Sequence, residues 1–151
     1  MEVERIKRMM DSCYLAKRAR EMLPPLPDGV HSSYIRYLDE IQKLEAQGHR
    51  PRVSDLSTAL NLPRPGVTRT VKEMEQKGYL KKQVSAEDGR VTYLSLTEAG
   101  KQLSQKYNAD YFRGLEPYLA DISEEEAECT IRTIEKFYQV MCERRNSLEN
   151  R

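Results

Sequence analysis

The stretch from residue 53 to residue 96 restricts the fold more than any other part of this chain. Ser54 is a favourable N-cap for a short helix, and the turn Asn61-Leu62-Pro63 follows it. A second helix is expected from about Pro65 to Lys77, with Arg64 at its cap position and Gly78 after its end. The apolar positions expected to be buried in the two helices are Leu56, Ala59, Leu60, Val67, Val71 and Met74.

Two runs of strand character come next, at residues 79–84 and 91–96. The residues between them include Asp88-Gly89, which is a hairpin signal when it lies between β-rich runs. A short helix, a turn, a second helix and a hairpin together predict a winged helix-turn-helix.

The flanking segments are predicted to be helical. Apolar spacing indicates helices at residues 1–23 and 32–46, and residues 51–53 are long enough only for a single bridge of strand. Thr97 caps a helix that is expected to reach Pro117, and Ser123 opens a capping box for a last helix that runs to about Leu148. The fold class is therefore mainly α, in the order α-α-β-α-α-β-β-α-α. The last helix has apolar residues at near-heptad spacing: Ala127, Ile131, Ile134, Tyr138, Met141 and Leu148.

Positive charge is concentrated in the middle of a nearly neutral chain of 151 residues with a net charge of +1. Residues 50–106 contain 11 basic and six acidic side chains, whereas residues 107–151 contain six and 10. This distribution is typical of a protein that presents one face to a polyanion. The same blocks also occur by chance in highly charged chains, so the charge alone leaves both interpretations open.

The helix that starts near Pro65 has one polar, basic stripe. Pro65, Thr68, Arg69 and Lys72 follow one another at spacings of three and four residues, opposite the apolar stripe. Arginine pairs with guanine through two hydrogen bonds and a threonine methyl contacts the thymine methyl, so this stripe suits base reading in a major groove. An ordinary solvated helix face is the alternative. The following hairpin favours DNA binding, because Arg90 at its tip can enter a minor groove.

Four short motifs resemble the MarR family of bacterial transcriptional regulators. They fall in the order and at the spacing of that family over about fifty residues, from Val53 to Leu103. The motifs are Val67-Thr68-Arg69, Lys77-Gly78-Tyr79-Leu80, Asp88-Gly89-Arg90 and Leu96-Thr97-Glu98-Ala99-Gly100.

The resemblance implies a homodimer that binds double-stranded DNA. Residues 1–49 would supply a dimerisation helix and a support helix, residues 50–97 the DNA-binding lobe, and residues 98–151 the C-terminal dimerisation helices of one continuous domain. Two lobes would read successive major grooves of a pseudo-palindromic operator. The regulator is expected to be a repressor. The DNA-binding residues would be Arg64, Pro65, Gly66, Thr68, Arg69, Lys72, Lys82, Asp88 and Arg90, with Asp88 orienting Arg90 by a charge-assisted bond.

The chain departs from the family pattern at three places. The recognition helix opens with Pro63-Arg64-Pro65-Gly66, where the family usually has Ser or Thr, and the base preference is therefore not transferable. Ser85 stands where the family often has Asp, and Gln83 follows Lys82, so phosphate contacts near the wing are expected to differ.

Family members are commonly released from DNA by a small, often aromatic ligand or by oxidation of a cysteine. A binding site with one cation among several tyrosines would suit a small aromatic or phenolic effector. Tyrosines at helical spacing are, however, more often core residues. Cys13, one turn before Lys17, is the candidate for redox sensing, and an inert buried thiol is the alternative. The candidate effector lining is Tyr14, Arg18, Tyr34, Tyr37, Tyr107 and Tyr111.

Other function classes find little support in the sequence. The motifs GxSxG, GxxxxGK[ST] and HExxH do not occur, so no catalytic residue and no cofactor is expected. His31 and His49 lack the spacing of a metal-ligand pair. Neither a signal peptide nor a spanning segment is predicted, so we expect no membrane partner and a cytoplasmic location. A winged helix used only for protein contact remains the alternative to DNA binding.

Overall fold

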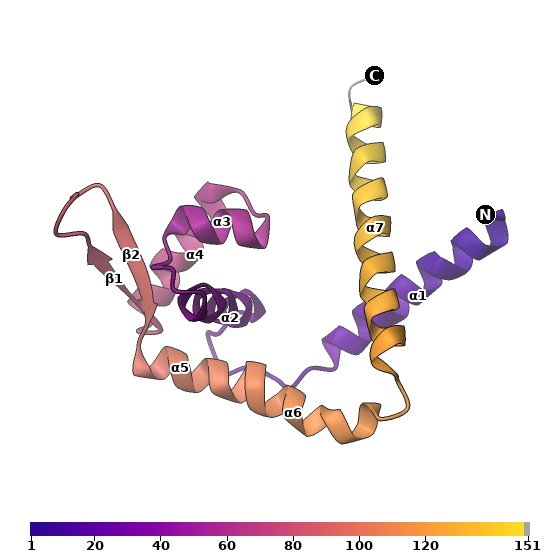
Figure 1. Cartoon of the computed structure of the whole chain (residues 1–151), viewed down its shortest axis with the longest axis horizontal. Helices are drawn as coiled ribbons and strands as arrows, with labels where there is room; N and C mark the ends of the chain where they lie inside the picture. The colour runs from indigo at the N-terminus through magenta and orange to yellow at the C-terminus, as the bar shows by residue number, and fades with distance from the viewer. Residues whose placement is uncertain (150–151) are drawn as a thin grey trace. The chain divides into compact units, whose positions relative to one another are not determined.

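The computed structural model describes the backbone of residues 1–149 and the side chains of residues 1–146 (Figure 1). The chain divides into two compact units, Met1–Gly100 and Lys101–Arg151. Leu148, the last residue of the predicted heptad stripe, lies outside the described side chains. Within the described residues, no helix combines the length and the apolar character that crossing a membrane requires.

The first unit contains the predicted helix-turn-helix and hairpin. Its elements are α1 (Val3–Glu21), α2 (Ser32–Ala46), α3 (Val53–Leu60), α4 (Arg64–Gln76), β1 (Leu80–Val84) and β2 (Thr92–Leu96). All except α1 contribute side chains to one core, because each has one apolar face that must be covered. The predicted core positions Leu56, Leu60, Val67, Val71 and Met74 are buried, and Ala59 is exposed instead.

The hairpin is a two-stranded antiparallel sheet in which Leu80 pairs with Leu96 and Val84 with Thr92. The predicted bridge at residues 51–53 is not a strand, because Val53 already belongs to α3. One backbone hydrogen bond remains there, from the Leu94 N–H to the Pro51 carbonyl at 2.8 Å. Proline has no N–H, so this residue can accept a ladder hydrogen bond but cannot donate one.

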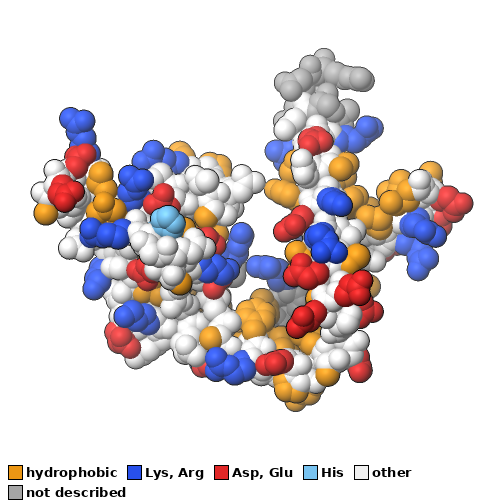
Figure 2. Space-filling model, in the orientation of Figure 1, with side chains coloured by type: hydrophobic (Ala, Val, Ile, Leu, Met, Phe, Trp, Pro, Cys, Tyr) orange, Lys and Arg blue, Asp and Glu red, His pale blue; other side chains and the backbone are white. Residues whose placement is uncertain are grey.

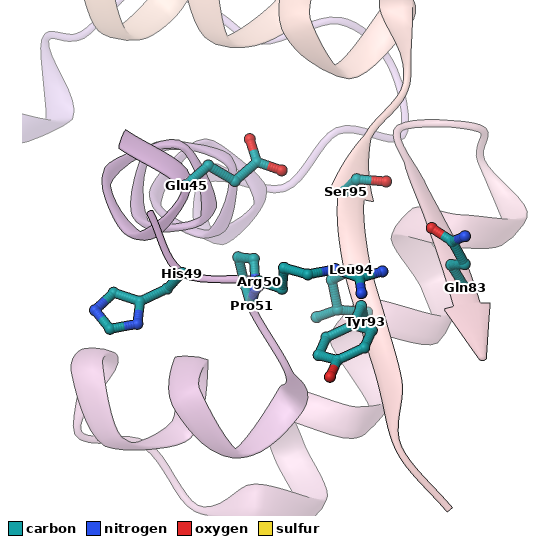
Figure 3. A pocket seen from close by; sticks show the side chains of 8 residues that line it. All are labelled: Glu45, His49, Arg50, Pro51, Gln83, Tyr93, Leu94 and Ser95. Atoms are coloured by element: carbon teal, nitrogen blue, oxygen red, sulfur yellow. The ribbon is translucent and has the colours of Figure 1, made fainter. Parts of the chain in front are cut away.

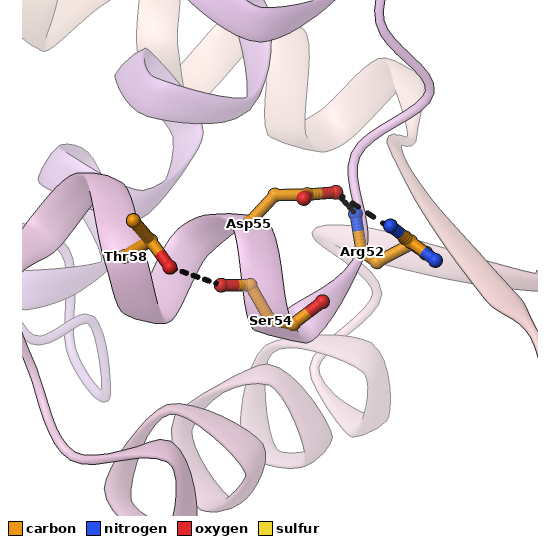
Figure 4. A network of polar contacts seen from close by, with 4 residues as sticks. All are labelled: Arg52, Ser54, Asp55 and Thr58. Carbon is orange, nitrogen blue, oxygen red and sulfur yellow. Dashed lines mark hydrogen bonds and ion pairs between the residues drawn. The ribbon is translucent and has the colours of Figure 1, made fainter.

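The α3 N-terminus is capped by a residue other than Ser54, which was the predicted cap. Arg52 occupies the N-cap position, and its backbone N–H donates to Asp55 Oδ2 at 2.8 Å (Figure 4). Ser54 lies in the first turn, where its carbonyl accepts the Thr58 hydroxyl at 3.1 Å. The Asp55 carboxylate satisfies the N–H of the N-cap residue, and the Arg52 carbonyl accepts the Asp55 N–H at 3.1 Å, so the donor that a hydroxyl cap would serve already has a backbone partner.

The start of α4 also differs from the prediction by one residue. Arg64 is the first helical residue and Pro63 is the N-cap, with φ −59° and ψ 132°. The Pro63 carbonyl accepts the N–H groups of Gly66 and Val67 at 3.1 and 3.2 Å. The restricted φ of proline suits this extended cap position, so the helix begins at Arg64, one residue before the predicted start at Pro65.

The second unit contains most of the remaining helices. The predicted helix after Thr97 consists of α5 (Glu98–Ser104), a π-helical segment η1 (Gln105–Asp110) and α6 (Tyr111–Leu115), and a 3₁₀ turn η2 (Glu116–Leu119) follows. The last helix, α7 (Glu124–Glu149), is 26 residues long. Its capping box is present, since Ser123 and Glu126 bond each other's backbone N–H groups.

Candidate nucleic-acid interface

The α4 helix has a buried face and an exposed basic face. Val67, Val71 and Met74 are each 0% exposed, and they hold the helix against its neighbours. The side chains on the other side are exposed, which leaves the N-terminal half of the helix open to a partner. These exposed residues are Arg64, Pro65, Gly66, Thr68, Arg69 and Lys72.

The polar groups of this exposed face are available for a ligand. Among the residues that the structure describes, Arg64, Arg69 and Lys72 take part in no ion pair. The Thr68 hydroxyl donates to the Arg64 carbonyl at 2.9 Å. Because this proton is bonded within the helix, the Thr68 methyl group and a hydroxyl lone pair are the parts of the side chain left for external contacts.

The wing turn is organised by two small polar side chains. Ser85 Oγ accepts the backbone N–H groups of Glu87 and Asp88 at 3.2 and 3.3 Å, and Asp88 Oδ1 accepts the Arg90 N–H at 2.9 Å. Asp88 therefore orients the backbone of Arg90, and the expected bond to the guanidinium is not present in the described residues. The reason is local: an Asp side chain readily accepts the N–H two residues further on, which shapes a tight turn.

Lys82 differs from the other basic candidates, because its charge already has a partner. Its Nζ atom lies 2.8 Å from Glu75 Oε2, which joins β1 to the C-terminal part of α4. The pairing was not apparent in the sequence, since the two residues belong to different elements.

Two arginines outside the predicted DNA-binding set lie beside the predicted interface elements. Arg50 places its guanidinium 3.9 Å from the centroid of the Tyr93 ring on β2, and Arg52 is exposed at the start of α3. Their position in the basic segment on either side of Pro51 was the only signal available for them. Figure 2 shows Lys and Arg side chains over the part of the chain that contains α3, α4 and the hairpin, and acidic side chains over the first turns of α7.

The candidate effector residues occupy different environments. Tyr34 and Tyr37 are 1% and 3% exposed in the core of the first unit, whereas Tyr14 and Arg18 are exposed on α1. In the second unit Tyr107 is buried, and Tyr111 is half-buried. Burial, followed by the hydrogen bond to Glu73, raises the pKa of Tyr34, so its phenol stays protonated.

One hollow in the first unit lies away from all these tyrosines. It has a volume of about 140 Å³ and is formed by the end of α2, the loop after it and both strands of the hairpin (Figure 3). A drug-sized ligand requires about 300 Å³ or more. In Figure 3 the His49 side chain points away from the others. The hollow therefore lacks the form of an aromatic effector site. Its lining residues are Glu45, His49, Arg50, Pro51, Gln83, Tyr93, Leu94 and Ser95.

The cysteine candidate Cys13 is half-buried on α1. The nearby Lys17 ammonium lies 3.7 Å from Glu21, so its charge is shared with a carboxylate rather than directed only at the thiol. Cys129 is exposed and Cys142 is half-buried, both on α7.

Comparison with known proteins supports the winged helix-turn-helix fold. The profile described as "MarR family" matches residues 28–91. The uncharacterized HTH-type transcriptional regulator YdgJ of Bacillus subtilis (strain 168) is 30% identical over 97 residues, which are 64% of this chain and 55% of that protein. The chain thus spans about half the length of this curated relative.

Two solved structures share the fold. The complex of Streptococcus pneumoniae FabT with DNA superposes with a TM-score of 0.69 at 21% identity, covering 94% of this chain and 99% of that chain. Staphylococcus aureus MepR bound to ethidium bromide gives a TM-score of 0.53 at 18% identity, covering 93% and 97%. At these identities the likeness establishes the winged-helix architecture.

Proposed function

We propose that the chain, whose winged segment matches the MarR family model, is a sequence-specific DNA-binding regulator of transcription. One observation carries the proposal. The apolar stripe of α4 is fully buried while Arg64, Thr68, Arg69 and Lys72 stand on its exposed side, and a hairpin with Arg90 in its turn follows. A rigidly held helix with free basic and hydrogen-bonding groups fits a major groove, and the hairpin suits the neighbouring minor groove.

The regulator acts as a homodimer on a pseudo-palindromic operator. The apolar residues of α1 and α7 support this proposal, since Ile6 and Met10 are 43% and 47% exposed and Ile131 and Ile134 are 49% and 46% exposed. Apolar faces of this extent on two helices are typical of a subunit interface. Two lobes related by a twofold axis then read half-sites about one helical turn apart.

Repression by occlusion and release by a small molecule complete the proposal. A dimer bound across a promoter excludes other proteins from the same DNA, and an effector that binds the free form better than the DNA-bound form lowers operator affinity. That MepR is recorded with ethidium supports a planar aromatic compound as the first effector to test.

The test is DNA binding in a gel-shift assay across a salt series, with operator sequences selected from random DNA. If each of two lobes neutralises several phosphates, affinity falls by about 10³ or more between roughly 50 and 200 mM salt. The selected sites are expected to be pseudo-palindromic. Absence of salt-dependent binding would instead favour a winged helix that contacts only proteins.

A further inference from the structure

Two carboxylates in the C-terminal half of α4 bond it to neighbouring elements. They belong to the residues directly before and after one buried residue. Met74 is 0% exposed, and helical geometry places Glu73 and Glu75 about 100° to either side of it. The Tyr34 hydroxyl of α2 donates to Glu73 Oε2 at 3.2 Å, and Glu75 Oε2 lies 2.8 Å from Lys82 Nζ on β1. The helix is therefore bonded to α2 on one side and to the wing on the other.

Lys82 lies on the inner face of the hairpin. Side chains alternate along a strand, so Lys82 shares a face with Leu80, and its cross-strand neighbour is Leu94. Leu80 and Leu94 are each 2% exposed, which places the stem of Lys82 beside the core. Lys81 belongs to the opposite face and is exposed.

The Glu75–Lys82 contact is also distinctive among the ion pairs. Residues three or four positions apart are joined by the ion pairs Lys7–Glu4, Lys17–Glu21, Lys43–Asp39, Arg52–Asp55 and Arg113–Asp110. The Glu75–Lys82 contact instead connects two separate elements, the helix and the hairpin of the candidate interface. Both of its side chains are about one-third exposed, at 37% for Glu75 and 31% for Lys82.

We propose that Glu75 is a positioning residue for DNA recognition: with Lys82 it fixes the wing relative to α4, and Lys82 neutralises no phosphate. The inference rests on the proposed DNA-binding function. Simultaneous contact with a major and a minor groove requires a defined spacing between the two elements. An ion pair that joins α4 to β1 behind the DNA-contacting residues provides this spacing. The pair thus contributes to selectivity through geometry, while Arg69 and Arg90 contact the DNA.

The variants are Glu75→Gln, Lys82→Met, the charge swap Glu75→Lys with Lys82→Glu, and the control Lys81→Met. Each is measured on a duplex that the wild-type protein selects from random DNA and on a mixed-sequence duplex, both across a salt series. Lys81→Met removes the same charge from the same strand and leaves the pair intact.

Both single variants of the pair are expected to lower the preference for the selected duplex by about two- to fivefold, the range expected from a partly exposed ion pair. The salt dependence is expected to stay as in the wild type. The swap restores the preference to within about twofold. A glutamate at position 82 would repel a phosphate, so this rescue distinguishes an internal pair from a DNA contact.

Two results would overturn the proposal. One is a salt slope that falls by about 1 per lobe in Lys82→Met, which would make Lys82 a phosphate ligand. The other is a Glu75→Gln variant that binds both duplexes more tightly, which would mean that Glu75 only masks a DNA-binding lysine.

Hydrogen exchange without DNA separates this inference from the proposed function. The amides of β1 and β2 are expected to exchange faster in Glu75→Gln and Lys82→Met and at the wild-type rate in the swap and in Lys81→Met. Unchanged exchange in both variants of the pair would refute the positioning role, even if the protein binds DNA. If the wild type selects no duplex from random DNA and does not bind the mixed-sequence duplex, the DNA-binding function fails, and restored protection in the swap still supports the contact that fixes the wing.

Discussion

Gly100 determines how closely the helix after the wing approaches Tyr79, the residue directly before β1. A Cβ atom there would lie 2.1 Å from the Tyr79 carbonyl oxygen and 3.1 Å from its carbon. That oxygen accepts the Thr97 N–H at 3.1 Å, and the Thr97 hydroxyl oxygen accepts the Gly100 N–H at 3.1 Å. The motif from Leu96 to Gly100 therefore has a structural role, because a capping hydroxyl and a missing side chain are both needed at this junction.

Gly100→Ala should destabilise the protein by about 1–3 kcal/mol, because the methyl group meets backbone atoms that cannot rotate away. Urea unfolding followed by circular dichroism measures the effect. Gly114→Ala is the matched control: Gly114 lies in α6 with no atom within 4 Å of the added methyl group. There the change should stabilise by up to about 1 kcal/mol through helix propensity. Equal effects at the two positions would contradict the steric argument.

The two arginines of the candidate interface are expected to have different roles. Arg69→Ala should cost about 1–3 kcal/mol per half-site and relax the base preference at one operator position, since Arg69 stands on the recognition stripe. Arg90→Ala should weaken binding broadly, most on A·T-rich flanks, without changing the preferred bases. Affinities for one operator and its single-base variants measure both effects. The reverse pattern would mean that helix and wing exchange these roles.

Asp88→Ala is expected to weaken DNA binding in the same way as Arg90→Ala. The cause is a lost bond to the Arg90 backbone and not, as the sequence predicted, to its guanidinium. Asp88 accepts the backbone N–H of Arg90, so its loss loosens the turn and spreads the positions of the arginine. A milder form of the Arg90→Ala effect follows.

At the scale of elements, α7 begins with a reciprocal cap that depends on pH. Glu126 Oε2 accepts both the N–H and the hydroxyl of Ser123 at 2.9 Å, and the Glu126 N–H donates to Ser123 Oγ at 3.2 Å. These bonds from Ser123 hold the pKa of Glu126 below its ordinary value. Their contribution is therefore complete above the pKa of an unfolded glutamate and is lost as the pH falls through the lowered pKa of the folded state.

Glu126→Gln should lower the melting temperature at neutral pH, because the amide accepts these hydrogen bonds without a charge. The difference from the wild type should shrink as the pH falls below the ordinary range of glutamate. Thermal unfolding across a pH series tests the expectation, with Glu125→Gln as the neighbouring control. A difference that stays constant with pH would show that the charge of Glu126 does not contribute.

At the scale of the whole molecule, the distribution of apolar surface is the main constraint. The core of the first unit is formed without α1, which has no buried residue, and α7 has Ile131, Ile134, Tyr138 and Met141 exposed. Two helices with uncovered apolar stripes are unusual in a monomer, so the proposed homodimer accounts for surface that the single chain leaves open.

Replacing Ile131 and Ile134 together by Asp should produce monomers or aggregates, because four charges then enter the twofold-related interface. Sedimentation velocity gives the oligomeric state. The control replaces Glu128 and Glu135 by Gln on the same helix, and it should leave the dimer in place. A dimer of wild-type strength in the double Asp variant would assign the interface to another surface.

Local patterns in the sequence were sufficient for the order of the α-helices and of the hairpin, for α2 at residues 32–46 and for the buried stripe of α4, but the predicted bridge at residues 51–53 was wrong. Periodicity and turn residues act within a few positions of the chain, so they are legible without coordinates. Only the tertiary structure decided that Tyr34 meets Glu73, that Lys82 meets Glu75 and that Asp88 bonds the Arg90 backbone. Such contacts join side chains that many positions separate, or depend on one turn conformation. Each contributes only about 1 kcal/mol and none repeats at the period of a helix or strand, so they cannot be recognised from the sequence.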